Sequence, residues 1–235
     1  MKEGLFFMGR PRKNPEYDPQ QIQNELIKLT VDLYRKKYTY RDIASELGLS
    51  VSKVVKLLVT GGVYTSDICD RINFLHEFGM SVQEIQAELG VSRATVQAYL
   101  PYKKGIYNAK ESSLNAKRIQ VFRWRQLAVQ NLLSDMGEEN LWEAVVAFQN
   151  YPFHTVTGLP FVYVLKKGRS GDYNKELIVS RRKESKTVVW SSVRLAFQKA
   201  LERQGEVIDR PKALGDIRGI SYIYPMLVRF GVVTV

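Results

Sequence analysis

Cysteine and histidine are scarce in this chain of 235 residues. Cys69 stands alone, so no disulfide can form within the chain, and we expect a protein of the reducing cytoplasm. The two histidines, His76 and His154, have no metal-ligating neighbours at a usable spacing. We therefore expect neither a metal site nor another cofactor.

Long hydrophobic runs are also missing. A membrane-spanning helix needs about 20 consecutive apolar residues, and no segment approaches that length. The beginning of the chain, "MKEGLFFM", contains an apolar run of only four residues, which is too short for the hydrophobic region of a signal peptide. These absences predict a protein that is neither secreted nor embedded in a membrane.

Sequence motifs of catalysis are absent as well. The chain has no phosphate-binding Gly-Lys-Ser/Thr loop, no nucleophile elbow and no Arg-His-Arg set to serve a nucleophilic tyrosine. Asp172, Glu184 and Lys186 superficially resemble the acidic and lysine positions of metal-dependent nucleases. In that family the Glu-x-Lys pair lies on a core strand, whereas residues 183–186 are expected to form a polar loop here. We predict a protein that is not an enzyme and keep the nuclease as an alternative.

Positive charge is what the chain has in excess. Its 35 lysines and arginines exceed its 24 aspartates and glutamates by 11, and the isoelectric point is near 9.6. Such an excess suits a polyanionic partner, nucleic acid before membrane. With 45% hydrophobic residues, the chain is long enough and apolar enough to bury two modest cores.

One sequence frame occurs twice, 42 residues apart: "ELGLSVSKVVKLL" at residues 46–58 and "ELGVSRATVQAYL" at residues 88–100. Each copy predicts two helices joined by a sharp turn. Gly48 and Gly90 are placed at these turns because glycine readily adopts the left-handed conformation that a sharp turn often requires.

The residues around each turn extend this prediction. Ser50 and Ser92 are placed to cap the second helix of each pair by accepting hydrogen bonds from unpaired backbone N–H groups. Pro101 ends the last helix. A further helix precedes each copy, within residues 20–37 and residues 68–78, so the repeat predicts two trihelical modules.

Both copies resemble the helix-turn-helix of bacterial transcription regulators and sigma-factor-like proteins, over about residues 38–104. The resemblance implies that the second helix of each pair enters the major groove of DNA, with its N-terminal residues facing base edges. There Arg93 suits guanine and Gln97 suits adenine. The implied DNA-binding residues are Ser50, Ser52, Lys53 and Lys56 in the first copy, and Ser92, Arg93, Thr95 and Gln97 in the second. Plain helical packing, or one working copy beside a degenerate one, stays open as the alternative.

The segment "MGRPRKNPEYDP" lies upstream of the repeat. Its Gly9-Arg10-Pro11 run, with Arg12 and Lys13, resembles an AT-hook core, in which arginines lie along a narrow minor groove. A plain basic arm that binds phosphates, or a tail without a role, remains an alternative. Phage terminase small subunits also begin with a basic arm before a helix-turn-helix, which supplies a second functional hypothesis.

The second half of the chain has a mixed pattern. Residues 113–133 predict a long amphipathic helix, and another helix follows from residue 138. The segment "GLPFVYVLKKGRSGDYNKELIVSRR" predicts two strands around a Gly-Arg-Ser-Gly-Asp turn. Two helices, near residues 187–204 and 221–230, close the chain. The residues Trp124, Trp142 and Trp190 are expected in the core.

The expected fold is mainly α with a small α+β C-terminal part: two trihelical helix-turn-helix modules followed by a helical domain containing one β-hairpin. The expected domains are a flexible basic arm over residues 1–20, a tandem helix-turn-helix region over residues 21–104 and an α+β domain over residues 105–235. If the protein forms a homo-oligomer, we expect the C-terminal domain to carry the contacts, because the modules must stay free for DNA.

The positive charge is concentrated in the C-terminal half. Residues 21–104 hold 11 basic and 9 acidic residues, whereas residues 150–235 hold 15 and 7. A basic hairpin can lie along a phosphate backbone and contribute affinity and salt dependence more than sequence choice. The candidate phosphate contacts are Arg181, Arg182, Lys183 and Lys186, with Lys166, Lys167 and Arg169 across the hairpin. A solvated run of charges is the alternative.

Together these features predict a cytoplasmic, nucleoid-associated protein that binds double-stranded DNA at specific sequences. A transcriptional regulator of a bacterium or a mobile element is the favoured interpretation, and RNA polymerase is a further partner to consider. The alternative is a phage-type DNA recognition and packaging protein that resembles a terminase small subunit.

Overall fold

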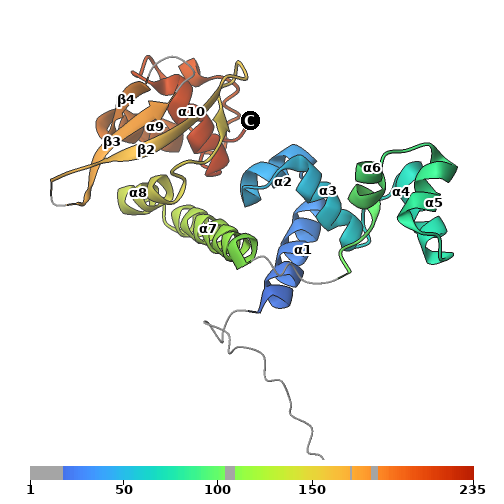
Figure 1. Cartoon of the computed structure of the whole chain (residues 1–235). Helices are drawn as coiled ribbons and strands as arrows, with labels where there is room; N and C mark the ends of the chain where they lie inside the picture. Colours follow the sequence, from blue (N-terminus) through green and yellow to red (C-terminus); the bar gives the residue numbers. More distant parts are fainter. Residues whose placement is uncertain (1–17, 104–108, 170, 181–184) are drawn as a thin grey trace, which may run out of the picture. The chain divides into compact units, whose positions relative to one another are not determined.

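The computed structural model describes residues 18–103, 109–169, 171–180 and 185–235 (Figure 1). The chain forms two compact units that divide between Ile119 and Gln120. The three-part division expected from the sequence stays a prediction. The basic arm with Arg10, Arg12 and Lys13 lies outside the described residues, as do Arg181, Arg182, Lys183 and Glu184.

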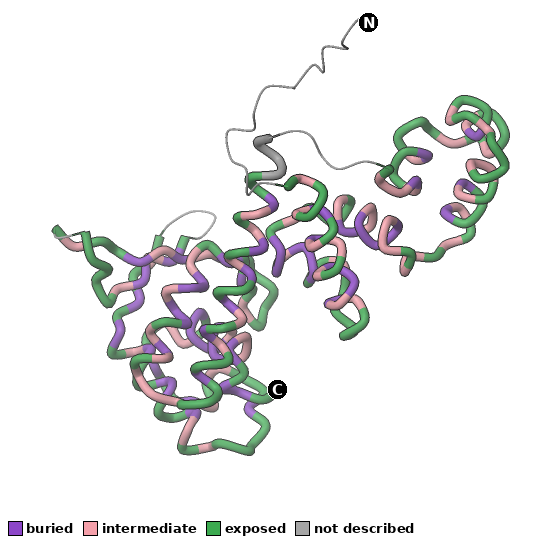
Figure 2. Tube along the Cα trace, turned by 90° about the horizontal axis from the view of Figure 1, so that it is seen from below, coloured by how far each residue is buried: buried purple, intermediate pink, exposed green. Residues whose placement is uncertain are grey.

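The first unit begins with three helices: α1 (Pro19–Arg35), α2 (Tyr40–Leu47) and α3 (Val51–Thr60). Each helix contacts the other two. Their shared core consists of fully buried aliphatic side chains, namely Leu26, Ile43, Leu47, Val54, Leu57 and Leu58. Figure 2 shows buried positions following one side of each helix, as expected of an amphipathic bundle.

Three more helices follow: α4 (Asp67–Glu77), α5 (Val82–Leu89) and α6 (Arg93–Tyr99). Their core is smaller and consists of Ile72, Ile85, Val96 and Leu100. We call α1–α3 the first module and α4–α6 the second module. The second module therefore has much less buried apolar surface to stabilise it.

The turns of the two modules have the geometry that the repeated frame predicts. Gly48 has φ 61° and Gly90 has φ 64°, both in the left-handed region. Ser50 and Ser92 cap α3 and α6 with their side chains. The sequence analysis therefore placed both turns and both caps correctly.

A second capping device repeats with the same spacing. Thr39 and Asp42 form a capping box at the start of α2, in which each side chain accepts from the other residue's backbone N–H group. Ser81 and Glu84 form the equivalent box at the start of α5. These pairs are a further part of the repeat, since Thr-x-x-Asp and Ser-x-x-Glu lie 42 residues apart in the sequence.

Helix α7 (Ala109–Ser134) begins in the first unit and ends in the second. Trp124 is 47% exposed and Leu127 is 55% exposed, so the prediction that Trp124 lies in the core is wrong. The physical reason is that apolar residues are scattered around α7 instead of forming one stripe, and only part of its surface packs against other helices. Trp190 is buried as predicted, and Trp142 is partly buried against the core.

The second unit continues with α8 (Glu138–Ala147) and a four-stranded antiparallel sheet in the order β1-β2-β3-β4. The strands are β1 (Phe153–His154), β2 (Pro160–Lys167), β3 (Tyr173–Ser180) and β4 (Ser185–Val189). The predicted hairpin is present as β2 and β3. The prediction of a single hairpin is wrong, because β1 pairs with β2 and β4 pairs with β3.

The misassigned strand is β4, which the sequence analysis divided between a polar loop and the following helix. Thr187, Val188 and Val189 are β-branched and suit a strand, with Val188 buried on the core face. The helix starts only afterwards, as α9 (Trp190–Glu202). Lysines at the start of the segment concealed this β-branched run.

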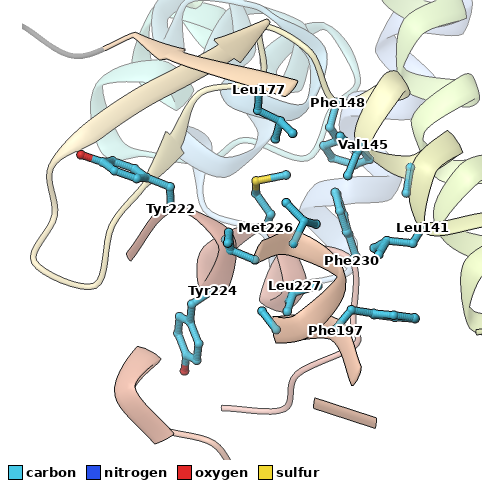
Figure 3. Packing of buried hydrophobic residues seen from close by; sticks show 14 of the residues in the cluster. Leu141, Val145, Phe148, Leu177, Phe197, Tyr222, Tyr224, Met226, Leu227 and Phe230 are labelled. Atoms are coloured by element: carbon cyan, nitrogen blue, oxygen red, sulfur yellow. The ribbon is translucent and has the colours of Figure 1, made fainter. Parts of the chain in front are cut away.

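Helix α9, a 3₁₀ turn (Pro211–Leu214) and α10 (Ile220–Arg229) pack with α8 and one face of the sheet around a core of buried apolar side chains. Figure 3 shows Phe148, Leu177 and Phe230 among the side chains that meet there. Tyr163 is fully buried, and its hydroxyl donates to the carbonyl of Val145 at 2.7 Å. Burial raises the pKa of this phenol well above its ordinary value.

We predict that Gly48→Ala destabilises the first module through its backbone. An added Cβ would meet only side-chain atoms of Arg118 at 4.0 Å, so the cost comes from the left-handed φ and is about 1–2 kcal/mol. Urea unfolding followed by far-UV circular dichroism measures this loss. Gly48→Asn is the matched control and should lose less, because asparagine tolerates the left-handed region. Equal stability of Gly48→Ala and the wild type would contradict the prediction.

Candidate nucleic-acid interface

The N-terminal ends of α3 and α6 carry most of the predicted base-reading residues. Ser50 Oγ accepts from the backbone N–H of Lys53 at 3.3 Å, and Ser92 Oγ accepts from that of Thr95 at 3.1 Å. Ser92 Oγ also lies 2.9 Å from Thr95 Oγ1. These hydroxyls therefore have a structural role as helix caps, whether or not they also face a ligand.

Ser52 and Arg93 are exposed in the first turn of their helices, and Gln97 is exposed one turn further along α6. Thr95 is partly buried beside its cap. An exposed arginine and an exposed glutamine four residues apart on one short helix have the hydrogen-bonding groups that bidentate contacts to base edges require. In the second module the structure thus brings Arg93 and Gln97 to one accessible helix.

Lys53 is directed toward the beginning of α7, within the first unit. Its Nζ donates to Asn115 Oδ1 at 3.2 Å, and Arg118 Nη1 donates to the same oxygen at 2.9 Å. Arg118 Nε also donates to the carbonyl of Gly48 at 2.9 Å. This network braces the turn before α3. The sequence analysis missed it because Asn115 and Arg118 lie more than sixty residues from that turn.

Lys56 points to the second module. Its Nζ donates to the carbonyls of Gln97 and Leu100, and it lies 5.1 Å from the centroid of the Tyr102 ring. Burial lowers the pKa of this ammonium group. The structure thus places Lys56 between α3 and the end of α6, where a contact with DNA would compete with these hydrogen bonds.

Four tyrosine rings follow one another from the first module to the second. Tyr34 and Tyr40 are stacked at 5.7 Å, Tyr40 and Tyr64 lie 6.1 Å apart, and Tyr64 and Tyr99 are stacked at 5.9 Å. Burial and the hydroxyl of Tyr34 raise the pKa of Tyr40 to about 12. The row links α1, α2, the connecting segment and α6.

The two modules carry opposite charge. Residues 18–62 hold seven basic and five acidic residues, whereas residues 63–103 hold three and five. The acidic residues of the second module all lie on α4 and α5: Asp67, Asp70, Glu77, Glu84 and Glu88. Phe74 on α4 and Phe78, which directly follows that helix, stack on each other at 6.4 Å and are mostly exposed. Counting both copies together concealed this difference from the sequence analysis.

Two of the predicted phosphate contacts of the hairpin, Lys166 and Lys167, have partners within the sheet. Lys166 Nζ lies 3.1 Å from Glu176 Oε2, and Lys167 Nζ lies 5.7 Å from the centroid of the Tyr173 ring. Arg169 is exposed, and Lys186 is partly buried on β4. Cations that are held by a single surface partner remain accessible to phosphate.

A second cationic cluster, which the sequence analysis missed, lies at α8. Lys175 Nζ lies 5.4 Å from the Trp190 ring and 3.6 Å from Glu138 Oε1. Trp190 Nε1 donates to Glu138 at 2.7 Å, and this hydrogen bond and the nearby cations lower the pKa of the carboxyl group. The cluster anchors the indole of Trp190 at the start of α9.

Of the nuclease-like residues, Asp172 and Lys186 are described and Glu184 is not. Within the described ranges, no group of three or more metal-ligating side chains is found. No helix in the same ranges has the length and apolar character needed to cross a membrane.

Comparisons of the chain with protein-family models, with curated proteins and with solved structures gave no match.

We predict that Glu84→Gln makes the free energy of unfolding depend less on pH in the acidic range. The Glu84 carboxylate accepts from the backbone N–H of Ser81 at 2.7 Å, and this capping box lowers its pKa below the ordinary 4.5. A carboxyl group with a depressed folded-state pKa stabilises the fold above its unfolded pKa, and this contribution is lost as pH falls through the folded pKa.

Urea unfolding by circular dichroism, stepped from about pH 6 to pH 3, should therefore show a weaker pH dependence for Glu84→Gln than for the wild type. Glu88→Gln is the matched control, since Glu88 lies on the same helix outside the capping box. An unchanged slope in Glu84→Gln would show that the box contributes nothing to acid stability.

Proposed function

We propose that the chain is a sequence-specific double-stranded DNA-binding protein, and a transcriptional regulator of a bacterium or a mobile element. In this proposal, α2–α3 and α5–α6 act as helix-turn-helix pairs, with α3 and α6 entering the major groove. The observation that carries it is the repetition of one local geometry. Each pair has a left-handed glycine turn, a serine cap and a second helix whose first turn is largely exposed.

The two modules differ in charge, so in this proposal they contact DNA in different ways. The first module has the positive balance that phosphate contacts need, whereas the second module carries all its carboxylates on α4 and α5 and an exposed cation, Arg93, at the start of α6. Phosphates would be repelled by α4 and α5, so only α6 of that module is suited to approach the groove. This supports an orientation in which α3 and α6 face DNA.

The first experiment is selection from random duplex DNA at near-physiological salt, followed by sequencing of the retained fragments. Recovery of two short motifs supports the proposal. Tight binding without any motif, with a steep salt dependence, would replace the sequence-specific regulator by a protein that recognises only the phosphate backbone.

We predict that Arg93→Ala relaxes sequence choice within one of the two motifs and leaves the other unchanged. Loss of a bidentate contact to a base costs about 1–3 kcal/mol at that base position. Binding titrations on single-base variants of the selected site measure the loss. Arg71→Ala is the matched control, because it removes the same charge from α4 of the same module. If both variants weaken all sequences equally, Arg93 does not read bases.

The hairpin of the second unit is proposed to add non-specific affinity. We predict that the double variant Lys167→Ala, Arg169→Ala reduces the salt slope of binding by about 2, because each phosphate contact contributes about 0.9. Lys212→Ala with Arg218→Ala removes the same charge elsewhere in the unit and serves as the control. Equal slopes for the two double variants would show that net charge, and not the hairpin, sets the salt dependence.

A packaging-type DNA recognition protein is the second candidate, and the exposed apolar surface of α7 favours it. Trp124 and Leu127 are three residues apart on one helix, so they lie on the same face. Such a surface suits contact with further copies of the chain in a ring or array. Light scattering coupled to size exclusion distinguishes the two, since a closed multimer supports the packaging protein.

A further inference from the structure

One of the last carbonyls of α6 has lost the backbone N–H group from which it could accept a hydrogen bond. In a helix, the carbonyl of Gln97 would accept from the backbone N–H of residue 101, but that residue is Pro101, which has none. The proline also prevents the helix from continuing, so the last carbonyls of α6 need partners from elsewhere in the fold.

The missing donor comes from the other module. Lys56, on α3, donates from Nζ to the carbonyls of Gln97 and Leu100. Between these two carbonyls, that of Tyr99 accepts from Asn73 Nδ2 of α4 at 3.0 Å. An ammonium group at a helix C-terminus also interacts favourably with the helix dipole. Lys56, which belongs to the first module, therefore caps the C-terminal end of α6 in the second module.

Further contacts surround this cap. Thr60 Oγ1 accepts from the backbone N–H of Tyr102 at 3.1 Å and donates to the carbonyl of Lys56 at 2.7 Å. The stacked rings of Tyr64 and Tyr99 lie on the same path between the modules. The junction thus combines hydrogen bonds from one turn of α3 with an aromatic contact from the connecting segment.

The two copies of the repeat have diverged to form this junction. The position equivalent to Lys56 in the second copy is Ala98, and the position equivalent to Pro101 in the first copy is Val59. Only the first copy supplies the ammonium group, and only the second copy lacks the backbone donor. The contact therefore joins two different surfaces. Two identical first copies, or two identical second copies, could not form it.

We infer that Lys56 is a positioning residue that fixes α3 and α6 relative to each other, so that one chain recognises a two-part duplex site with one set spacing. This inference rests on the proposed function. A chain with a fixed pair of recognition helices binds one separation of its two half-sites best and loses affinity when that separation changes. Flexible modules would instead bind many separations with similar avidity, limited only by the reach of their linker.

The test uses duplexes that carry the two selected motifs with spacers lengthened or shortened in single base-pair steps through about one helical turn of 10.5 base pairs. The wild type should prefer one spacer by about tenfold or more, and Lys56→Met should reduce this preference to about threefold or less. A wild type without a spacer preference, or Lys56→Met with the wild-type preference, would overturn the inference.

Two further variants separate positioning from simple stabilisation of α6. Lys56→Arg keeps a cationic donor and should restore the spacer preference. Pro101→Ala returns the backbone N–H to the end of α6 without linking the modules. Combined with Lys56→Met, Pro101→Ala should recover thermal stability and leave the spacer preference lost. Recovery of the preference in this double variant would show that Lys56 acts only by capping α6, and the inference would be wrong.

A measurement without DNA keeps failure of the inference distinct from failure of the proposed function. Spin labels at Ser52→Cys and Ala94→Cys, which are exposed equivalent positions of the two copies, report the distance between α3 and α6 in a Cys69→Ala background. We expect one narrow distance distribution in the wild-type junction and a broad one in Lys56→Met. Identical distributions would overturn the inference. If specific DNA binding is absent, the proposed function and the half-site spacing that depends on it are overturned. The measured distances still show whether Lys56 holds α3 and α6 at a fixed separation.

Discussion

The arrangement of the first unit depends on one constraint at the end of α6: the carbonyl of Gln97 has no backbone N–H group from which to accept a hydrogen bond. Pro101 removes the N–H group that would satisfy Gln97, and the ammonium group of Lys56 takes its place. Because Lys56 belongs to the other module, satisfying one helix end also joins two small bundles. The joining is important because the core cluster of the second module has four buried side chains, Ile72, Ile85, Val96 and Leu100, and such a small core gains support from a better-packed neighbour.

The same junction gives a physical reason for the repeat. Duplicated modules that stayed identical would each be complete, and nothing in their sequences would favour one relative placement. Here a lysine in one copy and a proline in the other make the copies complementary. The divergence of charge follows the same division, since carboxylates gather on α4 and α5 while the first module keeps an excess of cations. The copies thus differ at the residues that join them and in the charge of their surfaces.

Local signals in the sequence predicted local structure well, whereas roles that depend on distant residues could not be predicted. Gly48, Gly90 and both serine caps follow from residue types at fixed spacing, and the capping boxes could have been found in the same way. Lys56 was assigned to DNA because its position along α3 was the only information available. Its acceptors lie more than forty residues away and become neighbours only through packing. For the same reason, β4 was missed until its pairing with β3 was seen.

In the proposed function, the first unit provides specificity for a DNA sequence and the second unit provides affinity for the phosphate backbone. Sequence choice requires side chains held at fixed positions against base edges, and the contacts around α3 and α6 provide such fixation. Electrostatic affinity for phosphate needs only accessible charge, and the exposed cations of the β2–β3 hairpin supply it without precise placement. In the proposed function, a junction that sets the separation of α3 and α6 would therefore control which sequences are bound, whereas the hairpin would control how strongly binding responds to salt.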